Sequence, residues 1–141
     1  MIRVENVSKS FGSKKALHQI SFEIQEGEIF GFLGPSGSGK TTMINVLTGQ
    51  LAADQGETVL LGKSSRNLTS NDLEQIGIVS DSSGFYEKMS LYKNLLIYAK
   101  LYGLKASRVD TVLDQVGLSD AKDIIAEKLS TGMKQRMFLA R

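Results

Sequence analysis

Apolar and polar residues alternate along the first part of the chain, which is the pattern of strands with one buried face. Residues 1–7 (MIRVENV) and 17–24 (LHQISFEI) show this alternation, and the turn residues Ser10–Ser13 lie between them. Two later runs, residues 28–33 (EIFGFL) and 76–81 (IGIVSD), are almost continuously apolar. Such runs are typical of strands buried on both faces, so they predict a parallel-sheet core.

A helical spacing of apolar residues follows the first of these runs and dominates the second half of the chain. Residues 41–49 predict a helix that ends at a glycine. Ser90 is placed to cap a helix that ends at Gly103. Residues 107–116 predict a second amphipathic helix and residues 121–127 (AKDIIAE) a short third one. We therefore expect the second half to be helical.

Composition excludes several classes of protein. The 141 residues are 41% apolar and 23% charged, which is typical of a globular domain. The net charge of +2 comes from dispersed Lys and Arg, so no nucleic-acid partner is expected. The absence of Cys excludes disulfides, and no apolar run approaches the roughly 20 residues of a membrane helix. We expect a soluble, cytoplasmic protein.

A glycine-rich stretch follows the first continuous apolar run and fits the motif G-x-x-x-x-G-K-[ST] at every defined position. Its glycines allow successive backbone N–H groups to surround phosphate oxygens, and the helix that follows adds the positive end of its dipole. Lys40 supplies an ammonium for the β- and γ-phosphates of ATP, and the Thr41 hydroxyl can bind Mg²⁺. A flexible loop without a ligand is the alternative, which the strand-to-helix context disfavours. We assign to this site Gly34, Pro35, Ser36, Gly37, Ser38, Gly39, Lys40, Thr41 and Thr42.

The octapeptide at residues 129–136 (LSTGMKQR) makes the pattern more specific. Ser130 is a good N-cap and Gly132 lies in the first turn of the helix that follows, so the free N–H groups there suit a phosphate. A plain helix cap is the alternative. The order of phosphate loop, second apolar run, helical insert and octapeptide resembles the nucleotide-binding domain of an ATP-binding cassette (ABC) transporter. The family signature is usually LSGGQ, which Thr131 and Met133 here depart from.

The resemblance implies an α/β fold, a P-loop NTPase of the ABC type that is incomplete at its C-terminus. Residues 1–86 would hold an antiparallel β subdomain and the phosphate-loop core with its parallel sheet. Residues 87–141 would form the helical subdomain, ending in the signature helix. Within this family, the sequence most resembles the ATPases of drug and bacteriocin exporters.

The resemblance also implies two partners. One is a second ABC ATPase subunit in a head-to-tail dimer, whose bound ATP contacts the signature residues of this chain. The other is a membrane-spanning transporter subunit, which would hold the chain on the cytoplasmic face of the membrane. The segment near that contact contains four apolar residues that could equally belong to the helical core. The signature residues are Ser130, Thr131, Gly132 and Met133, and the contact candidates are Phe85, Tyr86, Met89 and Leu91.

Three further positions match the family one by one. Phe11 corresponds to the aromatic residue that stacks on adenine, although packing on the first hairpin is the alternative. Ala16 corresponds to a small residue beside the adenine. Asp81 stands where the family usually has a Gln that binds Mg²⁺, and an aspartate is a hard oxygen ligand. A loop aspartate that caps the backbone is the alternative there.

No carboxylate of the chain matches the general base of the family, which would lie on a strand beyond Arg141. We therefore expect a fragment of a transport ATPase that binds ATP and Mg²⁺ but does not hydrolyse ATP alone. The alternatives are a natural, non-catalytic nucleotide-binding module and a soluble ABC ATPase without a transport role. Without the flanking strands, we also expect the apolar residues of 28–33 to be exposed and the chain to be poorly stable or to self-associate.

Overall fold

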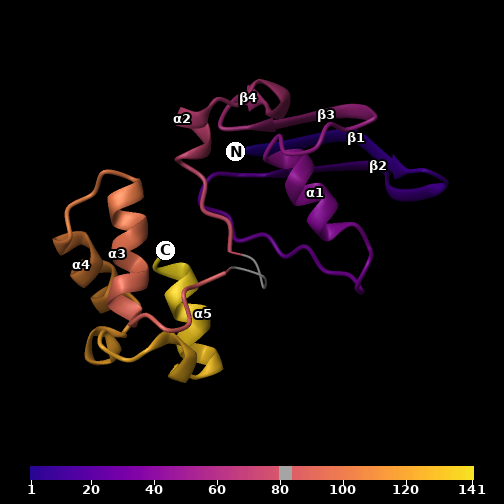
Figure 1. Cartoon of the computed structure of the whole chain (residues 1–141). Helices are drawn as coiled ribbons and strands as arrows, with labels where there is room; N and C mark the ends of the chain where they lie inside the picture. Colours follow the sequence, from indigo (N-terminus) through magenta and orange to yellow (C-terminus); the bar gives the residue numbers. More distant parts are fainter. Residues whose placement is uncertain (80–83) are drawn as a thin grey trace. The chain divides into compact units, whose positions relative to one another are not determined.

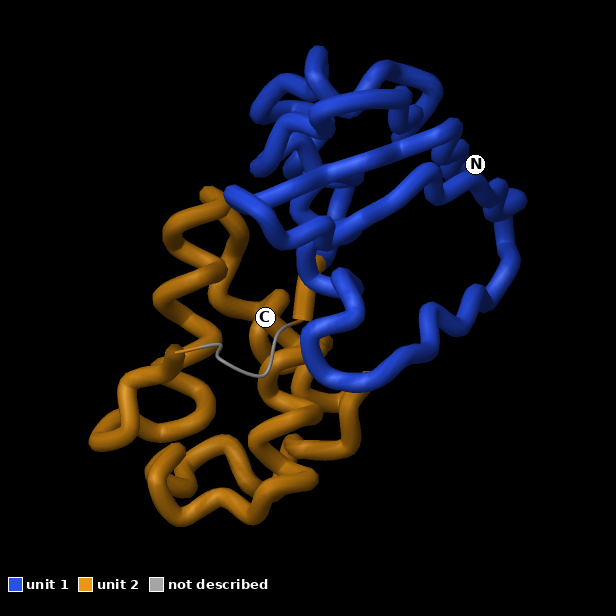
Figure 2. The backbone as a smooth tube through the Cα atoms, turned by 90° about the vertical axis from the view of Figure 1, so that its right-hand side faces the viewer, with its two compact units in different colours: residues 1–77 blue, residues 78–141 orange. Residues whose placement is uncertain are grey.

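The alternating segments form an antiparallel sheet (Figure 1). The computed structural model describes residues 1–79 and 84–141, which divide into two compact units, Met1–Gly77 and Ile78–Arg141 (Figure 2). The strands of the first unit lie in the order β2-β1-β3-β4, and every strand pair that the structure describes is antiparallel. Their bounds are β1 (Ile2–Phe11), β2 (Lys14–Ile24), β3 (Gln55–Leu60) and β4 (Lys63–Ser64). The boundary between the β subdomain with the phosphate-loop core (residues 1–86) and the helical subdomain (residues 87–141) stays a prediction.

Helix α1 (Lys40–Leu47) packs against this sheet and completes the core of the first unit (Figure 1). Val4 and Val7 of β1 are both buried although they are three positions apart, a spacing that places side chains on opposite faces of a regular strand. The strand is not regular between the two valines: its register shifts there, and Asn6 has a φ of 49°. This irregularity allows both side chains to lie on the same face of the sheet. Both valines therefore face Met43 of α1.

The two continuous apolar runs do not form the predicted strands. Residues 28–33 and 76–79 have no regular secondary structure, and residues 80 and 81 lie outside the described part of the chain. The predicted parallel sheet is therefore wrong for the residues that the structure describes. The physical reason is that a strand needs hydrogen-bonding neighbours, and within 1–79 and 84–141 no neighbouring strand pairs with either run.

The aromatic residues of the first apolar run are partly covered, since Phe30 and Phe32 are 41% and 37% exposed, and its aliphatic residues are bare. The rings of Phe30 and Phe32 lie 5.2 and 5.8 Å from that of Phe22 on β2, measured between ring centroids. Ile29 and Leu33, by contrast, are 99% and 93% exposed. The predicted exposure of this apolar segment is thus confirmed.

The second unit consists of helices, as the sequence predicts. Its long helices are α3 (Leu91–Leu101), α4 (Ser107–Gln115) and α5 (Thr131–Leu139), and two 3-10 turns cover Ser119–Ala121 and Ala126–Lys128. They pack around one apolar core. Within the described part of the chain, no helix is long and apolar enough to cross a membrane.

Ser90 caps α3 as predicted, because its Oγ accepts a hydrogen bond from the N–H of Lys93. The helix predicted at residues 121–127 is wrong. The carbonyl groups of Lys122 and Ile124 accept hydrogen bonds from the first N–H groups of α3, so they are not available to a helix of their own.

Residues 84–90 are joined to the segment that precedes the signature. The N–H of Ala126 donates to the carbonyl of Met89, and the N–H of Glu127 donates to that of Glu87. The four contact candidates differ in exposure. Leu91 is fully buried in the core, Phe85 and Met89 are partly buried, and Tyr86 is 56% exposed.

The short helix α2 (Ser70–Leu73) begins with a charged network. Asp72 accepts hydrogen bonds from the N–H and hydroxyl of Thr69 and from the ammonium of Lys63, at 2.8, 2.7 and 2.7 Å. These bonds, the one from Lys63 above all, lower the pKa of Asp72 from 3.8 to about 2. The carboxylate is therefore ionised throughout the neutral range.

We predict that the exposed face of residues 28–33 drives self-association. At high concentration the chain should form oligomers in size-exclusion chromatography with light scattering, and Ile29→Lys with Leu33→Lys should return it to monomer. Leu101→Lys with Leu139→Lys is the matched control, since those leucines are 74% and 67% exposed on the second unit. A sharp monomer peak and a cooperative melt of the unmodified chain would contradict the prediction.

A second prediction concerns pH and the Asp72 network. A carboxylate with a lowered pKa stabilises the folded state above its unfolded pKa of 3.8, and this contribution disappears as the pH falls toward about 2. Asp72→Asn should therefore lower the melting temperature at neutral pH, and the difference from the unmodified chain should shrink between these two values. A difference that stays constant down to the lower value would show that the charge of Asp72 does not matter.

Candidate functional site

The predicted phosphate loop leads directly into α1, and two of its glycines have left-handed backbone conformations. Gly39 precedes the helix with a φ of 95°, and Gly37 has a φ of 79°. Both lie in the left-handed region, where a residue with a Cβ is strained. The first N–H groups of α1 have no helical acceptor, so they and the positive end of the helix dipole suit an anion at this end.

The loop is supported from behind by β2. A Cβ added to Gly39 would lie 2.4 Å from the carbonyl oxygen of Ala16 and 2.9 Å from Cδ2 of Leu17. Only glycine allows this approach. The structure therefore brings together two of the predicted site residues, Ala16 and Gly39, that are far apart in the sequence.

Lys40 lies with its ammonium inside the loop. Its Nζ donates to the carbonyl oxygens of Gly34 at 2.6 Å and Pro35 at 2.8 Å, and it lies 3.4 Å from Oγ of Ser38. An ammonium has three donors, so these oxygens can be replaced by phosphate oxygens without moving the helix. Thr41 is exposed next to it, which leaves its hydroxyl accessible to a hard cation. Thr42 is partly buried.

Phe11 is the last residue of β1, and it is 52% exposed. Gly12 follows with a φ of 58° and begins the turn to β2. The ammonium of Lys9 lies 5.8 Å from the centre of the Phe11 ring. An exposed aromatic ring at the end of a strand is a suitable surface for a flat base.

The signature residues lie at the start of α5 in the second unit. Ser130 caps this helix as predicted, with its Oγ accepting a hydrogen bond from the N–H of Met133 at 3.3 Å. Thr131 is the first helical residue. Around Gly132 no described atom lies within 4 Å of the position a Cβ would take, so this helix end is open. Arg136 fastens the helix to the end of α4 through the carbonyl groups of residues 116 and 117.

Of the two predicted metal ligands, Asp81 lies outside the described residues and Thr41 is on α1. Among residues 1–79 and 84–141, no group of three or more His, Asp or Glu side chains could hold a metal ion alone. A cation at Thr41 would therefore need oxygen atoms from the nucleotide, which is how Mg²⁺ usually binds beside phosphates. The role of both residues stays a prediction.

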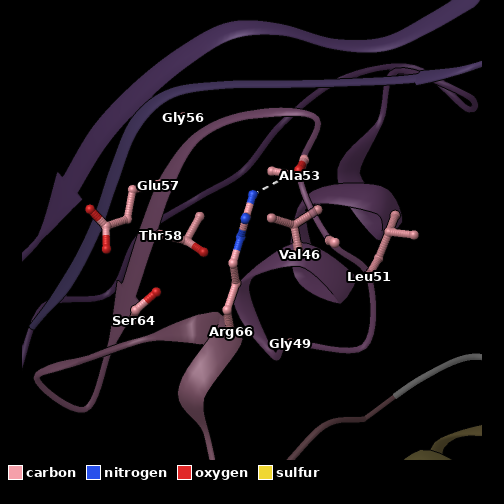
Figure 3. A pocket seen from close by; sticks show the side chains of 10 residues that line it. Val46, Gly49, Leu51, Ala53, Gly56, Glu57, Thr58, Ser64 and Arg66 are labelled. Carbon is pink, nitrogen blue, oxygen red and sulfur yellow. Dashed lines mark hydrogen bonds between the residues drawn. The ribbon is translucent and has the colours of Figure 1, made fainter.

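A cavity of about 270 Å³ lies at the other end of α1 (Figure 3). The guanidinium of Arg66 reaches across it and donates to the carbonyl oxygen of Ala53 at 2.9 Å. This contact fixes the connection between α1 and β3. The adjacent residue Asp54 binds Lys9 and Ser10 of β1, a link that the sequence analysis missed because nothing local to either segment signals it. The cavity is lined by Val46, Gly49, Leu51, Ala52, Ala53, Gly56, Glu57, Thr58, Ser64 and Arg66.

A glycine loop that encloses a lysine at a helix N-terminus defines a P-loop nucleotide-binding protein. The family pattern described as ABC transporter matches residues 17–141, so the chain belongs to the ABC transporter family. It is 35% identical to the bacitracin transport ATP-binding protein BcrA of Bacillus licheniformis, over all of this chain and 46% of that protein. It is 37% identical to the linearmycin resistance ATP-binding protein LnrL of Bacillus subtilis, over 97% of this chain and 45% of that protein.

The solved structures agree with this assignment. The ADP conformation of an ATP-binding cassette of an ABC transporter superposes with a TM-score of 0.79 at 30% identity. The match covers 99% of this chain and 63% of that one. The fold is thus that of a P-loop NTPase of the ABC type, and the chain spans about half the length of the curated relatives named above.

We predict that Gly39→Ala destabilises the first unit, because it combines a strained φ with a 2.4 Å contact to the Ala16 carbonyl. The free energy of unfolding should fall by about 2 kcal/mol or more in a denaturant titration. Gly31→Ala is the control, since its Cβ would meet no described atom within 4 Å and its φ is not positive. Equal stability of the two variants would contradict the contact.

Proposed function

We propose that the chain is the ATP-binding part of an ABC transporter ATPase, which couples ATP binding and hydrolysis to export by a separate membrane subunit. The observation that carries this proposal is the ammonium of Lys40 inside the glycine loop at the start of α1. That arrangement suits the β- and γ-phosphates of a nucleotide. The names of the relatives, which include a bacitracin transport protein and a linearmycin resistance protein, support export of an antibiotic-like compound.

The nucleotide would be held at three points in the first unit. The loop N–H groups and Lys40 would bind the phosphates, Thr41 would contribute its hydroxyl to Mg²⁺, and Phe11 would stack on the adenine. Ala16 would leave room for the base, since its side chain is small and its backbone carbonyl lies close to Gly39 of the loop. Asp81 would supply a second oxygen ligand to the metal.

The signature at the start of α5 would bind the γ-phosphate of ATP held by a second subunit. Its open helix end, with free N–H groups and the Ser130 hydroxyl, has the chemistry that a phosphate requires. Thr131 and Met133 replace the family's usual glycine and glutamine, but Gly132 keeps the close approach open. A head-to-tail dimer with ATP sandwiched between two chains follows from this role.

A membrane-spanning subunit would hold the assembly on the cytoplasmic face of the membrane. Tyr86 is the best placed of the candidates to contact it, because it is 56% exposed whereas Leu91 is buried in the helical core. No residue that we assign to the site is a general base. We therefore propose that this chain binds nucleotide and that hydrolysis needs residues outside it.

Lys40→Ala tests the nucleotide site. Isothermal titration with Mg-ATP should show at least about a tenfold loss of affinity, since hydrogen bonds to a charged group are lost. The exposed Lys100→Ala on α3 removes the same charge away from the site and should bind normally. Equal affinities for ATP in the Lys40→Ala and unmodified chains would overturn the proposed function.

A further inference from the structure

The end of β1, which carries Phe11, is not held by a regular sheet. The pairing of β1 with β2 changes register between Val7 and Lys9 and again between Lys9 and Ser10. On its other side, the pairing of β1 with β3 ends at Ser8. Residues 9–11 therefore pair with β2 alone and with an irregular register, whereas residues 2–4 pair with both β2 and β3.

Asp54 replaces the missing ladder on the β3 side. Its backbone N–H donates to the carbonyl of Ser8 at 2.9 Å, and its Oδ2 accepts from the N–H of Ser10 at 2.8 Å. Its Oδ1 accepts from the ammonium of Lys9 at 2.7 Å. One residue thus holds three consecutive residues of β1, and the third of these precedes Phe11 directly.

Lys9 connects this network to the ring itself. Its side chain is only 14% exposed, and its ammonium lies 5.8 Å from the centre of the Phe11 ring while it is bound to Asp54. A cation at this distance attracts the face of an aromatic ring. The hydrogen bonds from Lys9 and Ser10 also lower the pKa of Asp54, so its carboxylate is charged at neutral pH.

The backbone that carries Asp54 is itself fixed by a hydrogen bond at the preceding residue. The preceding residue, Ala53, accepts a hydrogen bond from Arg66 across the cavity at the end of α1 (Figure 3). The carboxylate therefore projects from a fixed connection toward a strand end that is otherwise irregular. An isolated ion pair with one exposed partner contributes little to stability, so this geometry has its main effect on position.

We infer that Asp54 is a positioning residue for adenine binding: it fixes the end of β1, directly and through Lys9, so that the Phe11 ring is presented to the base. This inference rests on the proposed function, in which Phe11 stacks on adenine. Asp54 does not touch the nucleotide. It should affect the affinity for the base and leave the affinity for the phosphates unchanged.

The test compares ATP with inorganic tripolyphosphate, which has the phosphates but no base, by isothermal titration of the 141-residue chain in the presence of Mg²⁺. Phe11→Ala should weaken ATP about tenfold, since a stacked base contributes roughly 1–3 kcal/mol, and should leave tripolyphosphate unchanged. Asp54→Ala should weaken ATP by about threefold to tenfold and tripolyphosphate by less than twofold, because it acts only through the ring. In the Phe11→Ala background, Asp54→Ala should have no further effect on ATP.

Two more variants separate positioning from a general loss of structure. Asp54→Asn keeps an acceptor for the N–H of Ser10 but loses the charge that holds Lys9, so its selective effect on ATP should be intermediate. Glu57 is an exposed carboxylate on the neighbouring strand β3. Glu57→Gln is therefore the matched control and should bind both ligands normally.

The outcomes distinguish the inference from the proposed function. An equal loss of ATP and tripolyphosphate in Asp54→Asn would overturn the inference, as would unchanged ATP affinity in Asp54→Ala when Phe11→Ala is weakened. Unchanged ATP affinity in Phe11→Ala would remove Phe11 from the adenine site and overturn the inference, while ATP binding through the phosphate loop would still support the proposed function. Failure of the unmodified chain to bind either ligand would overturn the proposed function itself.

Discussion

Every buried backbone N–H and C=O group must have a hydrogen-bond partner, and this constraint determines which parts of the chain form regular structure. The N-terminal strands satisfy it among themselves, so β1 to β4 form a sheet with α1 packed against it. Residues 28–33 have the composition of an interior strand but no neighbouring strand among the described residues. Their rings cover Phe22, and the rest of their apolar surface stays exposed.

The phosphate loop depends on the same sheet. Its conformation requires glycine at position 39, both for the left-handed φ and for the close contact with Ala16 on β2. The strand thus determines where the loop turns, and the loop determines where α1 begins and where Lys40 places its ammonium. The two halves of a nucleotide would be bound by one continuous piece of structure, because the same hairpin carries Phe11 at its tip.

Local chemistry allowed much of this to be predicted from the sequence. The start of α1 after the glycine loop, the caps at Ser90 and Ser130 and the glycine that follows α1 each depend on a few adjacent residues, and all are confirmed as local structure. The binding of phosphate by the loop stays a prediction. The strand at residues 28–33 and the helix at residues 121–127 were wrong because both depend on partners distant in sequence. The Asp54 network was missed for the same reason, since a carboxylate more than forty residues after Lys9 gives no local signal.

The two hydrogen bonds between residues 87–89 and 126–127 have a mechanical consequence for the second unit. They join backbone to backbone, and Ser130 follows only three residues after the second of them. Such a connection is stiff, because a hydrogen bond between two backbone groups does not change when side chains change rotamer. A displacement of the backbone near Tyr86 would therefore be passed to the capped end of α5 through the main chain.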